Sequence, residues 1–174
     1  MRYWLLGAMM MVGAASANTS LFNLLSSGER IDPLTMMEKV EAEYPGYIAE
    51  FALDLKEGEL LYEFDVINSE ENTLTKLTFR AADGSMVVQR NSKLEADDHD
   101  ELEAVKLLER KQMSFSELVR LATQKHQGKL LEAQLEHDLD ISYLEFKMVD
   151  ENGKRKHAFD VHKLKPLPML QWER

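Results

Sequence analysis

The stretch YPGYIAEFALDLKEGELLYEFDV, from Tyr44 to Val66, decides the fold that the sequence predicts. Its Pro-Gly pair is typical of the end of a helix, and from Ile48 onward apolar and polar residues alternate, as in a strand with one buried face. A turn at Gly58 leads into a second alternating run that ends at Val66. The stretch therefore predicts the end of a helix followed by an antiparallel pair of strands.

The residues on either side extend this unit. Asp32 suits the N-cap of a preceding helix, because its carboxylate can accept a backbone N–H, and Pro33 suits the first helical position. A third alternating strand follows over residues 75–80, and Asp83-Gly84 is a strong hairpin signal before a short fourth strand at 86–88. The sequence thus predicts a helix covering one face of an antiparallel sheet.

The same pattern returns later in the chain at a constant offset in residue number. Gly46 corresponds to Gly128, an offset of 82, and the match continues through a helix, a turn and three strands. Further pairs at this offset are Glu50 and Glu132, Leu53 and Leu135, Glu63 and Glu145, Phe64 and Phe146, Val66 and Met148, Leu77 and Phe159, and Phe79 and Val161. The offset predicts two copies of one α-β-β-β unit. It also places Pro166 opposite Gly84, which does not favour a closing hairpin in the second copy.

An acidic segment connects the two predicted copies. Acidic residues crowd the start of residues 95–112 and basic residues close its end, which complements a helix dipole, and apolar residues recur at helical spacing. We therefore expect a connecting helix that docks on one or both halves. A calcium loop is the alternative, but the segment lacks the glycine and the spaced ligand positions of such a loop. Ser114 and Glu117 then form a capping box at the start of the second copy's helix.

The N-terminal residues have the pattern of a secretory signal peptide. Arg2 precedes a short apolar run from Tyr3 to Gly13, and Ala15-Ser16-Ala17 matches the small-residue cleavage site. The run is shorter than the roughly 20 residues of a membrane span, although an uncleaved anchor is the alternative. With no cysteine in the chain, a lipid anchor on cysteine and disulfides are excluded. We expect an exported, soluble, periplasmic monomer without membrane insertion after cleavage.

The residues quoted above resemble the PepSY domain of secreted and periplasmic bacterial proteins and peptidase propeptides. The resemblance is carried by YPGYI (44–48), LYEFDV (61–66) and AADG (81–84), and it covers residues 32–89 better than 114–163. The family usually carries an Asp-Ala-x-Thr-Gly hairpin, whereas this chain has Arg80 and Asp83 in place of the aspartate and the threonine. The resemblance implies a non-catalytic module that restrains or assists a peptidase, or senses in the envelope.

The expected fold class is α+β, with two PepSY-like α-β-β-β units, each a helix packed on its own small antiparallel sheet, joined by a helical connector. The boundaries are a signal peptide at 1–17, an N-terminal arm at 18–31, a first unit at 32–90, an acidic connector at 91–112, a second unit at 113–165 and a C-terminal tail at 166–174.

Few residues in the sequence indicate chemistry. The net charge of −10 argues against nucleic acid and anionic lipid as partners. The histidines lack the spacing of a zinc motif, and only His126 and His157 are expected near the same end of the second sheet, which leaves one metal hypothesis. No nucleophile elbow or phosphate-binding glycine loop is present. Glu50, Glu63, Glu132 and Glu145 are expected on a solvated strand face, with a glycosidase-like pair as the alternative. We expect no enzyme activity and no cofactor.

Apolar residues on the polar strand faces are the remaining candidates for function. They are expected either to form the contact between the copies and the connecting helix, or to bind another protein. These partner-binding candidates are Leu61, Ile67, Leu74, Tyr143 and Val149. The predicted function is a periplasmic binding module that modulates a peptidase or another envelope protein through a sheet face or an edge strand. The alternative is a small-ligand or metal-binding periplasmic protein.

Overall fold

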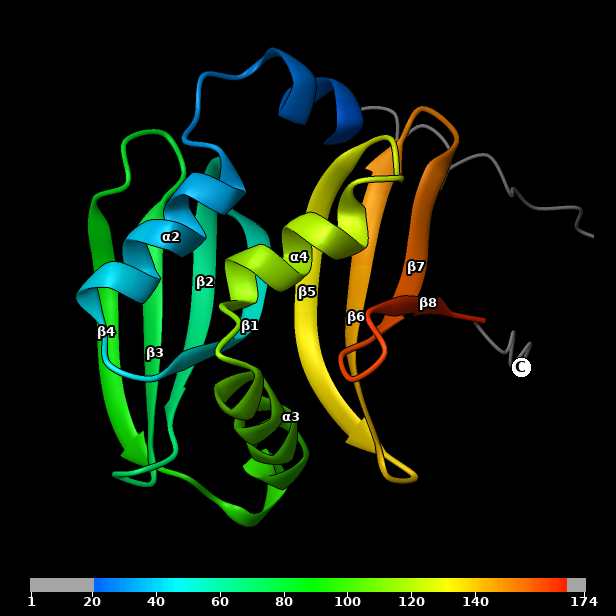
Figure 1. Cartoon of the computed structure of the whole chain (residues 1–174). Coiled ribbons are helices and arrows are strands. Elements are labelled where there is room, and N and C mark those ends of the chain that lie inside the picture. Colours follow the sequence, from blue (N-terminus) through cyan, green and yellow to red (C-terminus); the bar gives the residue numbers. More distant parts are fainter. Residues whose placement is uncertain (1–20, 169–174) are drawn as a thin grey trace, which may run out of the picture.

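A computed structural model describes residues 21–168, so the predicted signal peptide and residues 169–174 of the tail lie outside the described residues. Its centre is one antiparallel sheet with the strand order β4-β3-β2-β1-β5-β6-β7-β8 (Figure 1). The strands are β1 (Tyr47–Lys56), β2 (Glu59–Asn68), β3 (Thr73–Arg80), β4 (Met86–Lys93), β5 (Lys129–Asp138), β6 (Ile141–Asp150), β7 (Gly153–Asp160) and β8 (Lys165–Leu167).

The expected pair of helix-on-small-sheet units is wrong, because β1 and β5 pair and join the two halves into this single sheet. The pairing is antiparallel and consists of Glu50 with Gln134, Phe51 with Ala133, and Ala52 with Glu132. Two separate sheets would each have left a strand edge with unpaired backbone N–H and C=O groups at this place. Joining β1 to β5 satisfies part of those groups and makes the apolar faces continuous.

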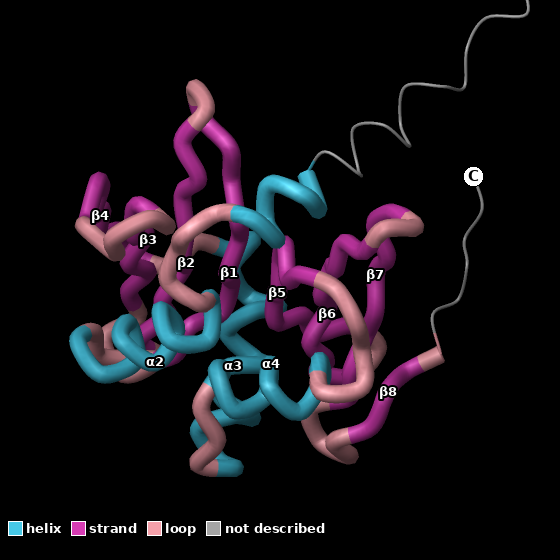
Figure 2. Tube along the Cα trace, turned by 90° about the horizontal axis from the view of Figure 1, so that it is seen from above, coloured by secondary structure: helices cyan, strands magenta, loops and turns pink. Residues whose placement is uncertain are grey.

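Within the described residues, four helices accompany the sheet: residues 21–27 are helical, and three further helices have capped or defined ends. Helix α2 (Pro33–Glu43) begins at Asp32, whose carboxylate accepts the backbone N–H of Leu34 at 2.9 Å. Helix α4 (Phe115–Thr123) begins at Ser114, whose hydroxyl accepts the N–H of Glu117 at 3.1 Å. The connecting segment forms a short 3-10 turn (Ala96–Asp98) and then α3 (His99–Lys111). Figure 2 shows α2 and α4 on the same side of the strands.

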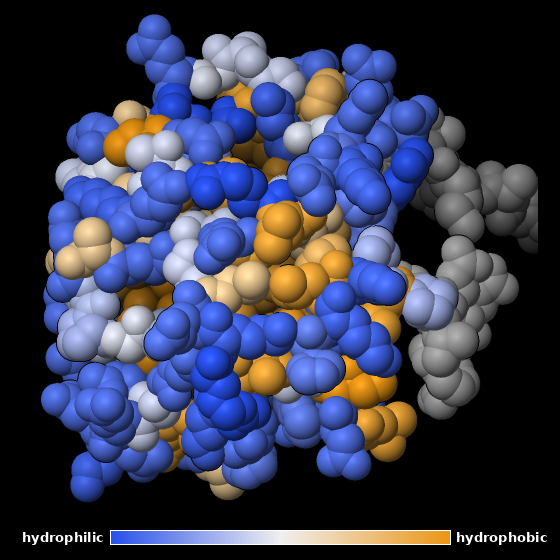
Figure 3. Space-filling model, in the orientation of Figure 1, coloured by the Kyte–Doolittle hydropathy of each residue, from blue (hydrophilic) through white to orange (hydrophobic). Residues whose placement is uncertain are grey.

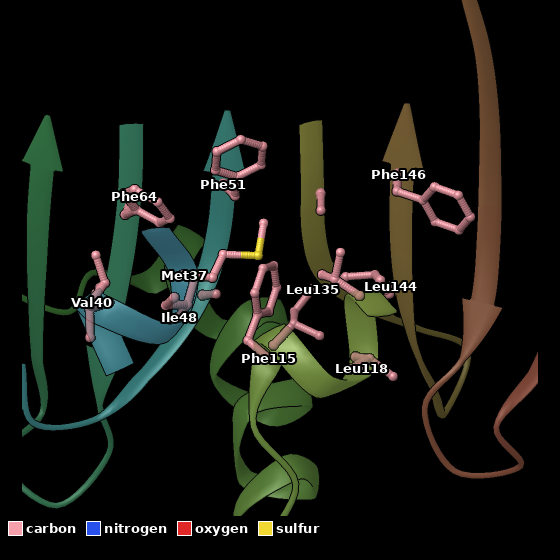
Figure 4. Close-up of a cluster of buried hydrophobic side chains, with 14 of the residues drawn as sticks. Met37, Val40, Ile48, Phe51, Phe64, Phe115, Leu118, Leu135, Leu144 and Phe146 are labelled. Atoms are coloured by element: carbon pink, nitrogen blue, oxygen red, sulfur yellow. The ribbon is translucent and has the colours of Figure 1, made fainter. Parts of the chain in front are cut away.

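One hydrophobic core extends through both halves beneath α2 and α4. Its fully buried side chains include Met37 and Phe64 from the first half and Leu144 from the second. In Figure 4, Phe115 of α4 and Met37 of α2 lie between the β1 and β5 sides of this core. Because both helices insert apolar side chains into the same layer, the halves share their burial rather than forming two independent cores.

The two halves repeat one local backbone geometry at the start of β1 and β5. Gly46 has a φ of 110°, and a Cβ there would lie 2.3 Å from the carbonyl oxygen of Ile67. Gly128 has a φ of 122°, and its Cβ would lie 2.6 Å from the corresponding oxygen of Val149. Each strand then contains an irregularity in its pairing, between Ile48 and Glu50 in β1 and between Leu130 and Glu132 in β5.

The predicted offset between the halves is wrong in the third strand, where it is smaller by two. Phe64 pairs with Leu77 in the first half, whereas Phe146 pairs with His157, not with Phe159, in the second. The cause is a shorter turn between β6 and β7, which ends at Gly153. Because the difference is an even number of residues, the side chains still alternate to the same faces.

Because of this shift, Leu164 rather than Pro166 corresponds to Gly84, and the second half also has a closing hairpin. The backbone N–H of Gly84 donates to Arg80 at 2.8 Å, and that of Leu164 donates to Asp160 at 2.9 Å. Leu164 adopts a φ of 53°, in the left-handed region that Gly84 occupies in the first half. The second hairpin is therefore present, and the beginning of the predicted tail forms the edge strand β8.

Candidate functional site

The pairing of β1 with β5 is arranged like a symmetric interface. It is centred on Phe51 and Ala133, which are related by the same offset as Gly46 and Gly128 and so correspond to each other in the two halves. An antiparallel pairing centred on corresponding residues relates the halves by an approximate two-fold rotation. We call these three residue pairs the seam. β1 and β5 diverge on both sides of it (Figure 1), so every feature on one side has a counterpart on the other.

Helix α3 lies at the lower opening, between the diverging ends of β1 and β5 in Figure 1. Its apolar residues Ala104, Val105 and Leu108 are fully buried in the shared core. It also contacts both halves through hydrogen bonds, because Gln134 Nε2 in β5 donates to Glu101 at 3.1 Å and the Ser69 hydroxyl of the β2–β3 turn donates to Glu109 at 2.6 Å. The connecting helix thus bridges the halves.

Carboxyl groups crowd around the first turn of α3. Burial raises the pKa of Glu136 to about 7, and the nearby charges of Glu101, Glu145 and Asp100 act in the same direction, while Lys156 opposes them. Glu101 also has one buried carboxylate oxygen, Oε2, without a hydrogen-bond partner among the described residues. The lower opening therefore contains carboxylates that repel one another at neutral pH.

Glu50, which belongs to the seam, also has a carboxyl group with a raised pKa. Burial raises the pKa of Glu50, and Asp65 and Glu132 add to the shift. Its counterpart Glu132 is instead bound by Lys147, with 2.7 Å between Nζ and Oε2. The two openings consequently differ in charge although their backbones correspond.

The Glu136 carboxyl should make stability depend on pH. The pKa of Glu136 is about 7 in the folded protein, compared with its ordinary pKa of 4.5. Between about pH 4.5 and 7, the folded protein therefore binds more protons than the unfolded protein does. Stability then falls as pH rises through this window, by about 1 kcal/mol once solvent screening at this partly exposed group is allowed for. Glu136→Gln should remove that loss, so urea unfolding should show a gain at about pH 8 and none at about pH 4.

The counterpart of Glu136 provides the control for this prediction. Asp54 occupies the corresponding position of the first half, but it forms an ion pair with Lys56 at 3.0 Å. Asp54→Asn should therefore give no stabilisation at either pH. An equal gain for both variants at high pH would show that the general negative charge, rather than the surroundings of Glu136, is responsible.

The upper opening, above the seam in Figure 1, contains a large cavity with a volume of about 740 Å³. Residues 21–27 form a short α-helix beside it, and Leu25 is buried there against Leu131 and Val149. This segment belongs to the predicted N-terminal arm. At the offset of 82 it corresponds to residues 103–109 of α3, so each opening holds a helix with buried apolar side chains.

The predicted partner-binding residues do not form an exposed apolar surface. Leu61, Ile67, Leu74 and Val149 are all buried, and Tyr143 is half-buried. Burial raises the pKa of Tyr143, with Glu136 as the next cause. The interpretation that these residues form internal contacts fits their burial, and no described surface brings the five together for a partner.

The two histidines that the sequence placed near one end of the second sheet do meet. The ring centroids of His126 and His157 are 4.0 Å apart, and His157 also stacks on Phe146 at 5.1 Å. Burial lowers the pKa of His157, followed by the effects of His126 and Arg155. No third metal-ligating side chain joins them among residues 21–168, so metal binding here stays a prediction. Packing of one aromatic cluster accounts for the arrangement.

Three of the four glutamates predicted on the solvated strand face, all except Glu50, form ion pairs with lysines on neighbouring strands. Glu63 pairs with Lys56 at 2.8 Å and Glu145 with Lys156 at 2.6 Å. Each of these carboxylates is held by a cation of its own sheet face. A structural role is sufficient to explain them.

Strand β4 is the open edge of the sheet, and its length was underestimated from the sequence. It runs from Met86 to Lys93, pairs only with β3, and has exposed side chains at all positions except the half-buried Val88. The predicted strand ended at residue 88 because the following residues are all polar and show no alternation. On the face shown in Figure 3, hydrophilic residues cover most of the β4 side, and hydrophobic ones gather around α4.

Comparisons with known proteins add little to this geometry. No family model matches the chain, and no curated protein matches it. Among solved structures, the crystal structure of a "putative lipoprotein" from Clostridium difficile 630 is similar, with a TM-score of 0.46 and 16% sequence identity over 83% of this chain and 95% of that one. Within residues 21–168, none of the helices has the length and apolar character needed to cross a bilayer.

Proposed function

We propose that this chain is a non-catalytic, PepSY-type binding module of the bacterial cell envelope that takes up an extended segment of a partner protein on its β4 edge. The observation that carries the proposal is the free edge of β4, eight residues long and paired on one side only. A partner strand can satisfy the unpaired backbone groups of such an edge by β-augmentation. The opposite edge, β8, has only three residues and contains Pro166.

The surroundings of β4 suit recognition of an added strand. Natural sheet edges are commonly protected by charged side chains, by proline, by β-bulges or by a covering segment. β4 carries Arg90 and Lys93 and has an irregular pairing beside Phe79, but it contains no proline, and no described element covers it. Val88 and Arg90 line a hollow of about 310 Å³ on the sheet face, together with Asp65 and Lys76. Side chains of an added strand would lie beside this hollow, which gives the site a means of selecting its partner.

The export route and the partner class rest on the sequence. The leader-like residues 1–17 support secretion to the periplasm, and the PepSY resemblance supports a peptidase as the partner. Among the described residues, a serine hydroxyl lies beside a histidine at one place, where Ser142 Oγ is 2.9 Å from His137 Nδ1, and Ser142 is buried. The non-catalytic role is proposed from the PepSY resemblance.

Proline substitutions on β4 test the edge directly. Neighbouring residues of an edge strand point their N–H groups alternately toward the sheet and away from it, so one of Gln89→Pro and Arg90→Pro removes an outward N–H and keeps the pairing with β3. That variant, recognised by its nearly unchanged unfolding free energy, should bind peptides selected from a displayed library at least tenfold more weakly than the unmodified chain.

The selected peptides must also act at β4 itself. The bound peptides should slow amide hydrogen exchange over residues 86–93. The other proline variant, which removes an N–H that pairs with β3, should be recognised by its lower unfolding free energy. Undiminished peptide binding by the stable proline variant, or protection confined to another part of the sheet, would contradict uptake at β4.

A further inference from the structure

The charges at the β4 edge follow from the register of the strands behind it. Asp65 of β2 lies opposite Lys76 of β3, and Lys76 lies opposite Arg90 of β4. Side chains directly opposite each other share a sheet face, so these three residues form one row across the sheet. We call it the charged row. It ends at the open edge with Arg90, whose side chain is exposed.

Arg90 is the member of the charged row that lacks a carboxylate. Lys76 binds Asp65, with 2.7 Å between Nζ and Oδ2. This hydrogen bond raises the pKa of Lys76, and the charges of Glu50 and Asp98 act in the same direction. Among residues 21–168, other arginines form ion pairs but Arg90 forms none. Because Lys76 and Arg90 have the same charge and lie directly opposite each other, a carboxylate on the far side of Arg90 would offset their repulsion.

The neighbouring row adds an apolar position. Thr78 of β3 lies opposite Val88 of β4, which comes two residues before Arg90 and therefore lies on the same face. Val88 is half-buried and lines the hollow of about 310 Å³ together with Ala52. Aliphatic and aromatic side chains pair favourably across strands with a β-branched residue. An added strand therefore gains from an apolar residue opposite Val88 and from an acidic residue opposite Arg90.

The order of these two residues in the partner follows from the direction of its strand. Every strand pair among residues 21–168 is antiparallel, and an antiparallel neighbour of β4 runs from Lys93 towards Met86. Such a strand meets Arg90 before Val88, with one residue between them. The preferred segment thus has an acidic residue, then any residue, then an apolar residue.

The two cations of β4 also indicate which occupant is disfavoured. Charged side chains on an edge strand hinder its pairing with most other strands. A second copy of this chain would bring another Arg90 and Lys93 to an edge whose charged residues are these same two cations. An acidic segment is complementary to them, so the edge selects against self-association and in favour of an acidic partner.

We propose that the β4 edge recognises an extended, antiparallel segment of a partner protein in which an acidic residue lies opposite Arg90 and an apolar residue, two positions later, lies opposite Val88. This inference rests on the strand uptake proposed above and adds the chemical character of the segment. The carboxylate pairs with Arg90, and the apolar side chain packs on Val88 beside the hollow.

A displayed library of random peptides tests this order, with the full chain as the bait. Peptides selected by the unmodified chain should be enriched in aspartate or glutamate two positions before an aliphatic or aromatic residue. Selection by the Arg90→Glu variant should replace this acidic residue with lysine or arginine. Changing the glutamate of a selected peptide to lysine should weaken its binding to the unmodified chain about fivefold and strengthen its binding to Arg90→Glu.

Lys93→Glu is the matched control. It makes the same charge change on the same strand, but Lys93 is three residues from Arg90, so its side chain points to the other face. This variant should bind acidic peptides somewhat more weakly but should still select the acidic residue before the apolar one. Both substituted side chains are exposed, so both variants should keep an unfolding free energy close to that of the unmodified chain.

The outcomes distinguish this inference from the strand uptake on which it rests. Peptides that protect residues 86–93 from exchange without a preference for an acidic residue would overturn the inference and leave strand uptake standing. The same acidic preference in Arg90→Glu would also overturn it, because charge elsewhere would then be responsible. Enrichment of the acidic residue after the apolar one would contradict the antiparallel placement. If no peptide bound at β4, strand uptake would fail and this inference with it.

Discussion

Gly46→Ala should destabilise the protein by more than about 3 kcal/mol, measured as the free energy of unfolding in urea. The new methyl group would lie 2.3 Å from the carbonyl oxygen of Ile67, and a φ of 110° is strained for any residue with a Cβ. The obstacle is the backbone of β2, which cannot move aside without breaking its pairing with β3. Gly128→Ala should have a similar effect, since its Cβ would approach Val149 at 2.6 Å.

Gly58→Ala is the matched control. Gly58 also has a positive φ, 85°, but a Cβ there would meet no atom within 4 Å. Its substitution should therefore cost only the backbone strain, about 1 kcal/mol. If Gly46→Ala cost no more than Gly58→Ala, the close approach of the neighbouring strand would not be what requires glycine at the start of β1.

Phe51→Ala should destabilise the whole protein by about 3–5 kcal/mol, because it empties a fully buried site at the centre of the seam. The ring of Phe51 packs against Tyr62 at 5.5 Å and Phe64 at 5.4 Å between ring centroids. Since Phe51 also pairs with Ala133 of the other half, the loss should lower the stability of both halves together. Urea unfolding followed by circular dichroism should show one transition at a lower midpoint.

Hydrogen exchange separates this outcome from independent halves. In Phe51→Ala, the amides of β2 and β6 should lose exchange protection by the same factor. Leu55→Ala is the control, because Leu55 lies in the same strand and is 48% exposed, and it should change the protection of both strands only slightly. Retained protection in β6 alongside lost protection in β2 would mean that the halves unfold separately in spite of the shared sheet.

The local elements were predictable because each has a short-range physical cause. The helix starts at Asp32 and Ser114 follow from side chains that accept backbone N–H groups, and the strand pairs follow from alternation around Gly58. The approach of His126 to His157 was also predicted, from the direction of the strands. The helix and strand signals lie within a few residues of the elements that they determine.

The seam had no comparable signal. Glu50, Ala52 and Gln134 look like any outward residues of a strand, and nothing in their sequence shows that another strand lies beside them. Predicting separate sheets followed from treating each copy as complete. The offset error in the third strand arose similarly, since turn lengths can change by two residues without altering which side chains are apolar.

The burial of the predicted partner residues has the same origin. Ile67 and Leu74 are apolar at positions where alternation requires a polar residue, which the sequence shows clearly. Whether such residues meet solvent depends on elements placed by the seam. The cavity at the upper opening was missed for this reason as well, because strands from both halves of the chain line it.

The short seam also has a consequence for the order of folding. Hairpins such as β1–β2 and β5–β6 close over a few residues, but pairing β1 with β5 closes a loop that contains β2, β3, β4, α3 and α4, and it is supported by only three residue pairs. Such a long loop is costly in entropy to close, so this step should come late. Until it occurs, both strands offer a bare edge to other molecules, and the newly made chain is most prone to aggregate during this interval.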